Sequence, residues 1–361
     1  MPLSVDAAAA VARVASRQAI ANTLAVHSRG VDRADGNLLA TAYHADATVD
    51  YGFFSGPAGE FVGILAAAQK SQPVTLHRTS NMWIEVAAAR ARSESYVIAY
   101  MEHRAEPVGM QRWVGGRYLD THEQRNGRWA LMHRKYVMDF NINRPSTSRV
   151  ADPAVALSDF GPRGGHGAAD AGRTLLALFG ARFKTLKDPT MTTDSADAKL
   201  HSVLAQQSLH DLNMAYARAA DRADEALMAS IFHDDATVVA GVCNGTGAAY
   251  ARDITAFIRN NLTRCFHSVA NEWFEIRGDH AIGESYVIAA VTAGGKDTMT
   301  GGRYVDAYER RGGVWKISHR VFVEDWNNAQ PTSHETTGMY ASLTTHGCFG
   351  KSDPVYEFWN Q

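Results

Sequence analysis

Two aspartate–histidine pairs are the side chains of this sequence best suited to moving protons. Asp32 and His77 belong to the first half of the chain, and Asp221 and His267 occupy matching places in the second half. An imidazole has a reference pKa of about 6.5, so it can take or give a proton near neutral pH. A carboxylate bonded to one ring nitrogen fixes the tautomer and stabilises the imidazolium. If the fold brings each pair together, these residues predict general acid–base chemistry.

Each member of these pairs also has a purely structural interpretation. An aspartate at a helix end beside Arg33 or Arg222 is often a cap or an exposed ion pair, and a histidine in a strand is often a satisfied core residue. Both interpretations stay open for a single residue. The occurrence of the same residue types at matching positions in both halves favours a dyad in at least one of them.

No motif for a cofactor or a covalent nucleophile accompanies the pairs. The glycine motifs of dinucleotide and P-loop sites, the HExxH zinc motif and the GxSxG nucleophile motif are absent, and the 15 histidines are scattered. We therefore expect cofactorless acid–base chemistry, with no cofactor and no metal.

The composition is that of a soluble globular protein long enough for two domains. Hydrophobic residues make up 45% of the 361 residues and charged residues 20%, and the formal net charge is -2, so no basic surface favours nucleic acid or an anionic membrane. Cys243, Cys265 and Cys348 show no CxxC spacing, which argues against a disulfide framework and a structural zinc site. Arg13 and Arg17 interrupt the N-terminal apolar run, so we expect no signal peptide and a cytoplasmic location.

The chain repeats one unit. The run "HADATV" at residue 44 returns as "HDDATV" 189 residues later, "ESYVIA" at residue 94 returns 190 residues later, and "GGRYLDTHEQRNGRWALMHR" at residue 115 returns as "GGRYVDAYERRGGVWKISHR" 186 residues later. Such a unit is too long for a solenoid repeat and has the size of a small domain. The two halves are therefore predicted to share one fold.

Each unit begins with a helical pattern. His27 in the first unit and Tyr216 in the second fall among apolar residues at helical spacing, which places them on the apolar side of a helix. This helix runs into an Asp-Arg-Ala-Asp segment that starts at Asp32 or Asp221.

A second helical pattern follows that segment. Asp35 and Asp224 stand where the N-cap of this second helix belongs. His44 and His233 are predicted to close it, because a partly cationic imidazole is favoured at a helix C-terminus.

The rest of each unit changes to the two-residue period of strands. Hairpin turns are predicted at the "NG" that starts at Asn126 and at the "GG" that starts at Gly312. Helices followed by a meander of long antiparallel strands predict an α+β fold, in which a curved antiparallel sheet wraps around helices and leaves a pocket at one end.

The order of these motifs resembles the SnoaL-like branch of the nuclear transport factor 2-like superfamily. The likeness covers about residues 15 to 142 and 204 to 328, and it implies two cone-shaped domains arranged as a pseudo-dimer. We predict a first domain at residues 1–142, a connector with a short helix at 143–203, a second domain at 204–328, and a C-terminal tail at 329–361 that packs over a pocket or a neighbouring subunit.

The resemblance also implies roles for particular residues. Dehydrochlorinase and dehydratase members of the superfamily use an Asp–His pair for proton abstraction, and both pairs of this sequence match those positions. Arg134 and Arg320 match a pocket arginine that stabilises a leaving anion or a phenolate. Their alternative is an outward ion pair with Glu123 or Glu309 on the adjacent strand, and the sequence leaves this choice open.

Aromatic and polar side chains of the first unit are predicted to line an apolar slot for aromatic rings. His103 has no histidine counterpart in the second unit, so the first pocket is favoured if the two differ in competence. The predicted substrate-binding residues are Tyr43, Tyr51, Asn81, Trp83, Tyr96, Tyr100, His103 and Trp113.

These features favour a cofactor-independent lyase with a small aromatic substrate, no nucleic-acid or membrane partner, and a homo-oligomeric state, dimer or trimer. The tandem layout is similar to bacterial lyases that release formaldehyde from lignin-derived diarylpropanes to give stilbenes. The alternatives are a dehydratase, a ketosteroid-isomerase-like enzyme with Asp32 or Asp221 as base, and a non-catalytic ligand-binding or assembly module.

Overall fold

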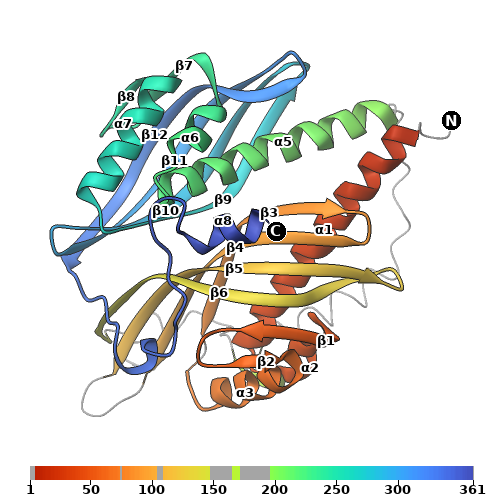
Figure 1. Ribbon diagram of the computed structural model, residues 1–361, viewed down its shortest axis with the longest axis vertical. Helices are drawn as coiled ribbons and strands as arrows, with labels where there is room; N and C mark the ends of the chain where they lie inside the picture. Colours follow the sequence, from red (N-terminus) through yellow and green to blue (C-terminus); the bar gives the residue numbers. More distant parts are fainter. Residues whose placement is uncertain (1–4, 74, 104–108, 147–164, 171–195, 361) are drawn as a thin grey trace.

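Two domains with the same order of helices and strands make up the protein. A computed structural model describes residues 5–73, 75–103, 109–146, 165–170 and 196–360. The second domain lies above the first in Figure 1, and one long helix leads into each of them. The short helix predicted in the connector, at residues 171–186, lies outside the described residues.

The first domain is a six-stranded sheet with three helices. Its sheet order is β2-β1-β6-β5-β4-β3; β1 pairs with β6 in parallel, and the other neighbours are antiparallel. The elements are α1 (Val5–Asp32), α2 (Gly36–Ala40), β1 (Tyr43–Asp50), β2 (Ser55–Pro57), α3 (Ala58–Lys70), β3 (Leu76–Ala87), β4 (Arg90–His103), β5 (Met110–Arg125) and β6 (Arg128–Pro145).

The second domain repeats this topology strand for strand. Its sheet order is β8-β7-β12-β11-β10-β9, with the same single parallel pair, β7 with β12. The elements are α5 (Ala196–Asp221), α6 (Glu225–Ser230), β7 (Phe232–Val239), β8 (Asn244–Thr246), α7 (Gly247–Asn261), β9 (Arg264–Arg277), β10 (His280–Ala293), β11 (Lys296–Arg311) and β12 (Val314–Pro331). The short η2 (Gly167–Ala169) precedes this domain, and η3 (Gly338–Tyr340) and α8 (Pro354–Asn360) follow it.

Bulges give each sheet the curvature that the fold needs. The register of β5 against β6 shifts between Gly115 and Gly116, and β11 shifts against β12 at the matching glycines. A Cβ on Gly115 would lie 1.9 Å from the Phe140 ring, and one on Gly116 would lie 2.4 Å from the Val137 carbonyl oxygen. The glycine pair is therefore required for this close approach, and the bulge bends the sheet around its helices.

The local signals for caps and turns are confirmed. The carboxylate of Asp35 accepts a hydrogen bond from the backbone of Leu38, and Asp224 does the same for Leu227, so both cap the short second helix. Asn126 has a φ of 51°, in the left-handed region that a tight hairpin turn requires.

The prediction that His44 and His233 close that helix is wrong. Both are strand residues, in β1 and β7, because the parallel pairing with the long last strand begins directly before them. Their Nε2 atoms lie 3.0 Å from the backbone carbonyls of Glu123 and Glu309. The two histidines therefore link β1 to β5 and β7 to β11, across the strand that lies between them.

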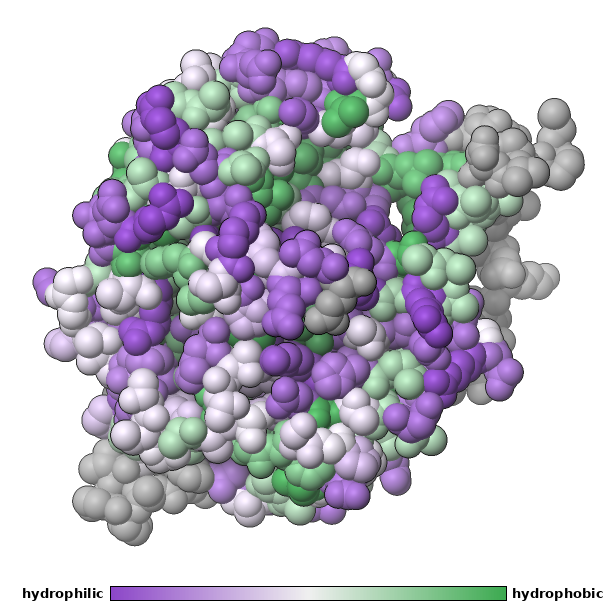
Figure 2. Space-filling view, viewed as in Figure 1, coloured by the Kyte–Doolittle hydropathy of each residue, from purple (hydrophilic) through white to green (hydrophobic). Residues whose placement is uncertain are grey.

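The two domains bury apolar faces of their sheets against each other. Phe266 of β9 inserts between Tyr96 and Phe140 of the first domain, with ring-centre distances of 5.0 and 5.1 Å. On the face in Figure 2, hydrophilic and hydrophobic residues are interspersed over both domains. No helix in the described ranges is both long and apolar enough to span a membrane.

A buried ion network joins the domains to the C-terminal tail. Arg117 of β5 donates to Asp353 at 2.7 Å and to Asp139 at 2.9 Å, and Arg222, directly after α5, donates to Asp353 at 2.8 Å. Asp353 precedes α8, which Figure 1 places between the two domains. The tail is thus an integral part of the interface.

His210 of α5 makes a second polar bridge across the interface. Its Nε2 lies 3.0 Å from the Met82 carbonyl of β3, and its Nδ1 bonds the Glu272 carboxylate. Burial alone would lower the pKa of His210, but the contacts with Glu272 raise it to about 9. Both ring nitrogens donate, so the folded state holds the imidazolium.

This bridge predicts a loss of stability at alkaline pH. Because the folded pKa lies above the unfolded value of about 6.5, the stabilisation is fully present below pH about 6.5 and disappears as pH rises through about 9. The natural protein should have a higher free energy of unfolding than His210→Gln at pH 6. This difference should be smaller by roughly 2–3 kcal/mol at pH 9.5. Urea unfolding at a series of pH values measures this; a pH-independent difference would contradict it.

Candidate active site

The end of each long helix faces the start of an edge strand, and there the Asp–His pairs meet. In the first domain Nδ1 of His77 lies 2.7 Å from Oδ1 of Asp32, and the backbone N–H of His77 donates to Oδ2 at 2.9 Å. The Thr75 hydroxyl donates to the same carboxylate at 2.8 Å. Asp32 therefore holds the strand and the imidazole together, and makes no ion pair with Arg33.

The second domain builds the same contact. Nδ1 of His267 lies 2.7 Å from Oδ1 of Asp221, and the His267 backbone donates to Oδ2 at 3.0 Å. Asp221 is fully buried. Burial alone would raise the pKa of this carboxyl, but the charge and hydrogen bonds of His267 keep it below its usual value. The carboxylate therefore stays ionised, Nδ1 carries a proton, and Nε2 is the atom left for proton transfer.

Arg134 and Arg320 are buried inside their domains, and neither pairs with Glu123 or Glu309. Arg134 donates twice to Asp120, at 2.8 and 2.7 Å, and Arg320 donates to Asp306 at 2.7 Å through both Nε and Nη2. The remaining Nη1 of each guanidinium is buried without a partner among the described residues. Each arginine thus completes a fork with its own carboxylate and leaves the N–H groups of Nη1 without a described partner.

A cavity of about 320 Å³ lies in the second domain and is lined by His267. Tyr216 and Tyr250 also line it, with their hydroxyls 2.6 Å apart, and so does Tyr304. The other walls are mainly apolar and include Val242, Ile254, Phe257, Ile258, Leu262 and Phe322. An oriented imidazole therefore meets an apolar space with a few phenolic hydroxyls, the usual make-up of a small-molecule site.

In the first domain, the side chains that the structure describes fill much of the matching space. Tyr51 stands where the second domain has Ala240, and its ring packs against Phe61 and Tyr136 with ring-centre distances of 4.4 and 5.4 Å. Burial raises the pKa of the Tyr51 hydroxyl well above its usual value, so it stays neutral. The packing of Tyr51 therefore favours the second pocket, whereas His103 in the sequence favours the first.

The tail covers what Tyr51 leaves open. Tyr340 packs against Ala99, Val114 and Met138 of the first sheet, and the Met138 backbone bonds Thr345 at 3.0 Å. The counterparts of Ala99 and Val114 in the second domain, Ala289 and Thr300, line the open cavity.

A known domain family accounts for both halves. The SnoaL-like domain matches residues 12–135 and again residues 201–321. The chain belongs to the SnoaL-like domain family. No curated protein matches it.

Solved structures of similar proteins each align with part of this SnoaL-like protein. LinA is 26% identical over 37% of this chain and 94% of its own, with a TM-score of 0.35. The LinA-type3 hexachlorocyclohexane dehydrochlorinase from Novosphingobium barchaimii LL02 is 23% identical over 39% and 99%, with a TM-score of 0.36. A candidate scytalone dehydratase from Novosphingobium aromaticivorans DSM 12444 is 19% identical over 35% and 88%, with a TM-score of 0.33.

Several residues predicted to bind substrate lie at the interface between the SnoaL-like domains instead. Asn81 hydrogen-bonds the backbone of β9, Tyr96 packs on Phe266, and Trp83 lies under the Arg218 guanidinium at 3.8 Å. A two-residue period separates the faces of a strand, but it does not tell which face a second domain covers.

The remaining predicted binding residues divide between the two faces. Tyr43 is buried in the first-domain core, whereas Tyr100 and Trp113 pack on each other with ring centres 5.1 Å apart. Trp113 packs against the interdomain apolar cluster. The side chain of His103 lies outside the described residues.

The sequence motifs do not predict the phenol pair of the second domain. Tyr216 fell among apolar residues at helical spacing, so it was assigned to the core, and Tyr250 gave no motif at all. One signal for Tyr216 is present in the sequence, because the residue at the matching position of the first unit, His27, is also polar. In the structure, burial, Arg134 and His77 hold the pKa of His27 well below its usual value.

Asp221, Cys265 and His267 lie close enough together to be considered as metal ligands. Burial raises the pKa of the Cys265 thiol well above its usual value, and Nδ1 of His267 already donates to Asp221. A metal would need the thiolate and a free Nδ1 lone pair, and this environment disfavours both. The trio is better suited to proton transfer.

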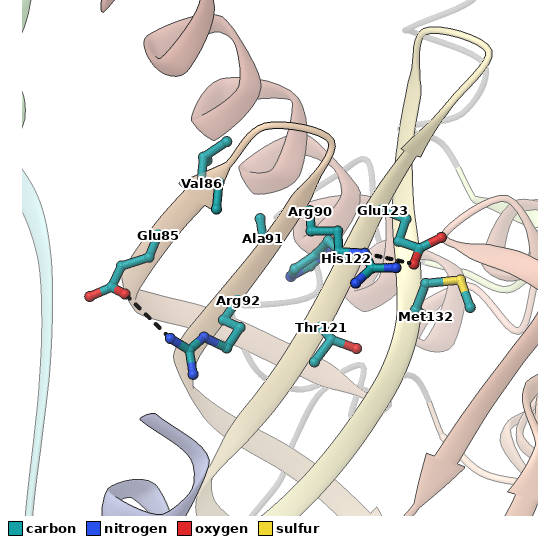
Figure 3. Close-up of a pocket in the computed structure, with 10 residues that line it drawn as sticks. Glu85, Val86, Arg90, Ala91, Arg92, Thr121, His122, Glu123 and Met132 are labelled. Atoms are coloured by element: carbon teal, nitrogen blue, oxygen red, sulfur yellow. Dashed lines mark ion pairs between the residues drawn. The ribbon is translucent and has the colours of Figure 1, made fainter. Parts of the chain in front are cut away.

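A larger cavity, of about 630 Å³, lies at the hairpin ends of β3 to β6 (Figure 3). Its long charged side chains pair with each other, Arg90 with Glu123 at 3.5 Å and Arg92 with Glu85 at 3.9 Å. Burial lowers the pKa of His122, which also lines it, to about 4. Neither dyad faces this groove, so size alone does not make it the candidate site.

Filling the second cavity tests its role as a binding site. Ala240→Tyr places in the second domain the side chain that fills the first, and we expect the Kd of an apolar stilbene to rise at least about tenfold, measured by its fluorescence. Val239→Tyr is the matched control, because Val239 lies next to Ala240 in sequence and is exposed. Equal Kd values for the two variants would contradict the assignment.

Proposed function

We propose that this protein is a cofactor-independent lyase whose working pocket is in the second domain. The observation that carries the proposal is a tautomer-fixed imidazole, that of His267, at the wall of an apolar cavity of about 320 Å³. Such a group is suited to general acid–base work near neutral pH, and the apolar walls suit an aromatic substrate.

The proposed chemistry is an elimination. Nε2 of His267 takes a proton from the substrate, and the buried carboxylate of Asp221 stabilises the imidazolium that forms. Burial raises the pKa of Tyr250 well above its usual value, so its hydroxyl stays neutral and can donate a hydrogen bond to a departing oxygen.

The narrower proposal is the deformylation of a diarylpropane diol of the kind derived from lignin. The benzylic hydroxyl leaves with a proton as water, and a base removes the proton of the terminal alcohol. The carbon–carbon bond to the terminal carbon then breaks, and that carbon departs as formaldehyde. The electron pair of the broken bond forms the new double bond of a stilbene. No oxidant or reductant is consumed, which fits a pocket of proton donors and acceptors.

The two histidines provide the test. His267→Gln is expected to lower turnover by at least about a hundredfold, because the base is removed, whereas His77→Gln, at the filled pocket, should keep turnover within about threefold. Product analysis of aromatic diols and ketosteroids by mass defines the reaction. Formaldehyde release supports the narrower proposal, loss of water alone selects a dehydratase, and a conjugated enone of unchanged mass selects an isomerase.

A protein that binds these compounds but turns none of them over would be a ligand-binding or assembly module, and the lyase proposal would fail. Cytoplasmic location and homo-oligomeric assembly stay predictions. Light scattering on the purified protein gives the number of subunits.

Asp221→Asn separates orientation from burial. The amide keeps the shape of the carboxylate but favours the wrong imidazole tautomer, so we expect kcat to fall by roughly 10²–10⁴ with little change in KM. Asp32→Asn is the control in the other domain. Equal losses for the two variants would argue for a structural role of both carboxylates.

A further inference from the structure

The backbone of His267 makes hydrogen bonds through both its N–H and its carbonyl group, and one of the two partners belongs to the other domain. Its backbone N–H donates to Asp221, as described above. Its carbonyl oxygen accepts a hydrogen bond from the Asn81 amide of β3 at 2.7 Å, and Oδ1 of Asn81 accepts from the Val269 N–H at 2.6 Å. Asn81 is only 4% exposed, so water does not compete for these bonds.

The Asn81 side chain takes the place of a missing strand. β9 is the edge strand of the second sheet, so the outward backbone groups of His267 and Val269 have no strand to pair with. A carboxamide presents N–H donors and a carbonyl acceptor in one plane, and so can pair with backbone groups as a peptide group does. It therefore satisfies both groups and fixes the peptide that carries the imidazole.

The backbone of Asn81 is arranged for this contact. Its φ is 46°, in the left-handed region, and it sits where the register of β3 shifts against β4 between Ser80 and Trp83. Asparagine tolerates this conformation better than most residues, but the conformation still has a free-energy cost. The bulge turns the amide out of its own sheet and toward β9.

We propose that Asn81 is a positioning residue for His267, so that proton transfer in the second domain depends on a side chain of the first. This inference rests on the proposed function of His267. It makes the first domain, whose own pocket is filled, a part of the catalytic machinery of its neighbour.

Other contacts at the same place offer a matched control. Ser80 bonds the hydroxyl of Ser268 at 2.8 Å, and Arg78 bonds the same hydroxyl at 2.7 Å. Both cross the interface as Asn81 does, but they reach a side chain that points away from the imidazole and leave the His267 peptide untouched. A general loosening of the interface would follow from either loss, whereas a loss of positioning follows only from Asn81.

The experiment compares Asn81→Gly with Ser80→Ala in the full chain. Glycine removes the amide without adding backbone strain, because it accepts a positive φ. We expect Asn81→Gly to lower kcat at least about tenfold with KM within about twofold, since small displacements of a reacting group cost rate more than binding. Ser80→Ala should keep both constants within about twofold.

A spectroscopic readout separates this inference from the proposed function. In histidine-labelled protein, the Nδ1 proton resonance of His267, assigned with His267→Gln, should shift or broaden in Asn81→Gly, while that of His77 stays in place. A shifted resonance with unchanged kcat would overturn the catalytic role of His267 and support the positioning. An unchanged resonance and unchanged kcat would overturn the positioning itself.

A second variant covers the case in which Asn81→Gly does not fold. Asn81→Asp keeps the acceptor for the Val269 N–H but sets an oxygen against the His267 carbonyl. We expect the same loss in kcat and the same selective shift of the His267 resonance. An Asn81→Asp protein with natural kcat and an unmoved resonance would overturn the inference.

Discussion

The buried contact between Asp353 and two arginines is the constraint on which the arrangement of the whole chain depends. Arg117 comes from the first domain and Arg222 from the second, and each needs a buried carboxylate because an unpaired charge there would cost several kcal/mol. Asp353 supplies it from the tail, together with Asp139. The tail passes so close that a Cβ on Gly347 would lie 1.7 Å from Oδ1 of Asp139. Domains and tail therefore satisfy one another's charges and form one cooperative unit.

This arrangement makes two similar domains unequal. The tail closes over the first sheet because Asp353 anchors it beside Arg117, so Tyr340 packs where the second domain has an open cavity. The same docking sets β3 against β9, where the amide of Asn81 completes the edge next to His267. The cavity lined by His267 thus lies in one domain, and a side chain of the other domain bonds the strand that carries this histidine.

Local chemistry made much of the fold predictable. Asp35 as a cap and Asn126 in a turn depend on a few neighbouring residues, and the duplication supplied each motif twice. The contact between His77 and Asp32 could be anticipated from the duplication of the pair and from family resemblance, but not from local spacing, because 45 residues separate them. The roles of Asn81 and Tyr96 could not be, since they depend on how the second domain covers the outer face of the first sheet. The prediction that His44 closes the second helix is wrong for a related reason, because the pairing of β1 with β6 overrides helical spacing.

The duplication of the Asp–His pair does not require two active sites. Asp32 accepts hydrogen bonds from the Thr75 hydroxyl and from the backbone and ring of His77, so it joins the end of α1 to the start of β3 whether or not a substrate ever enters. Losing such a buried acceptor would leave donors unsatisfied at a cost of about 1–3 kcal/mol each. The fold alone can therefore retain the pair, and the feature that separates the domains is the space beside the imidazole, which Tyr51 fills and Ala240 leaves open.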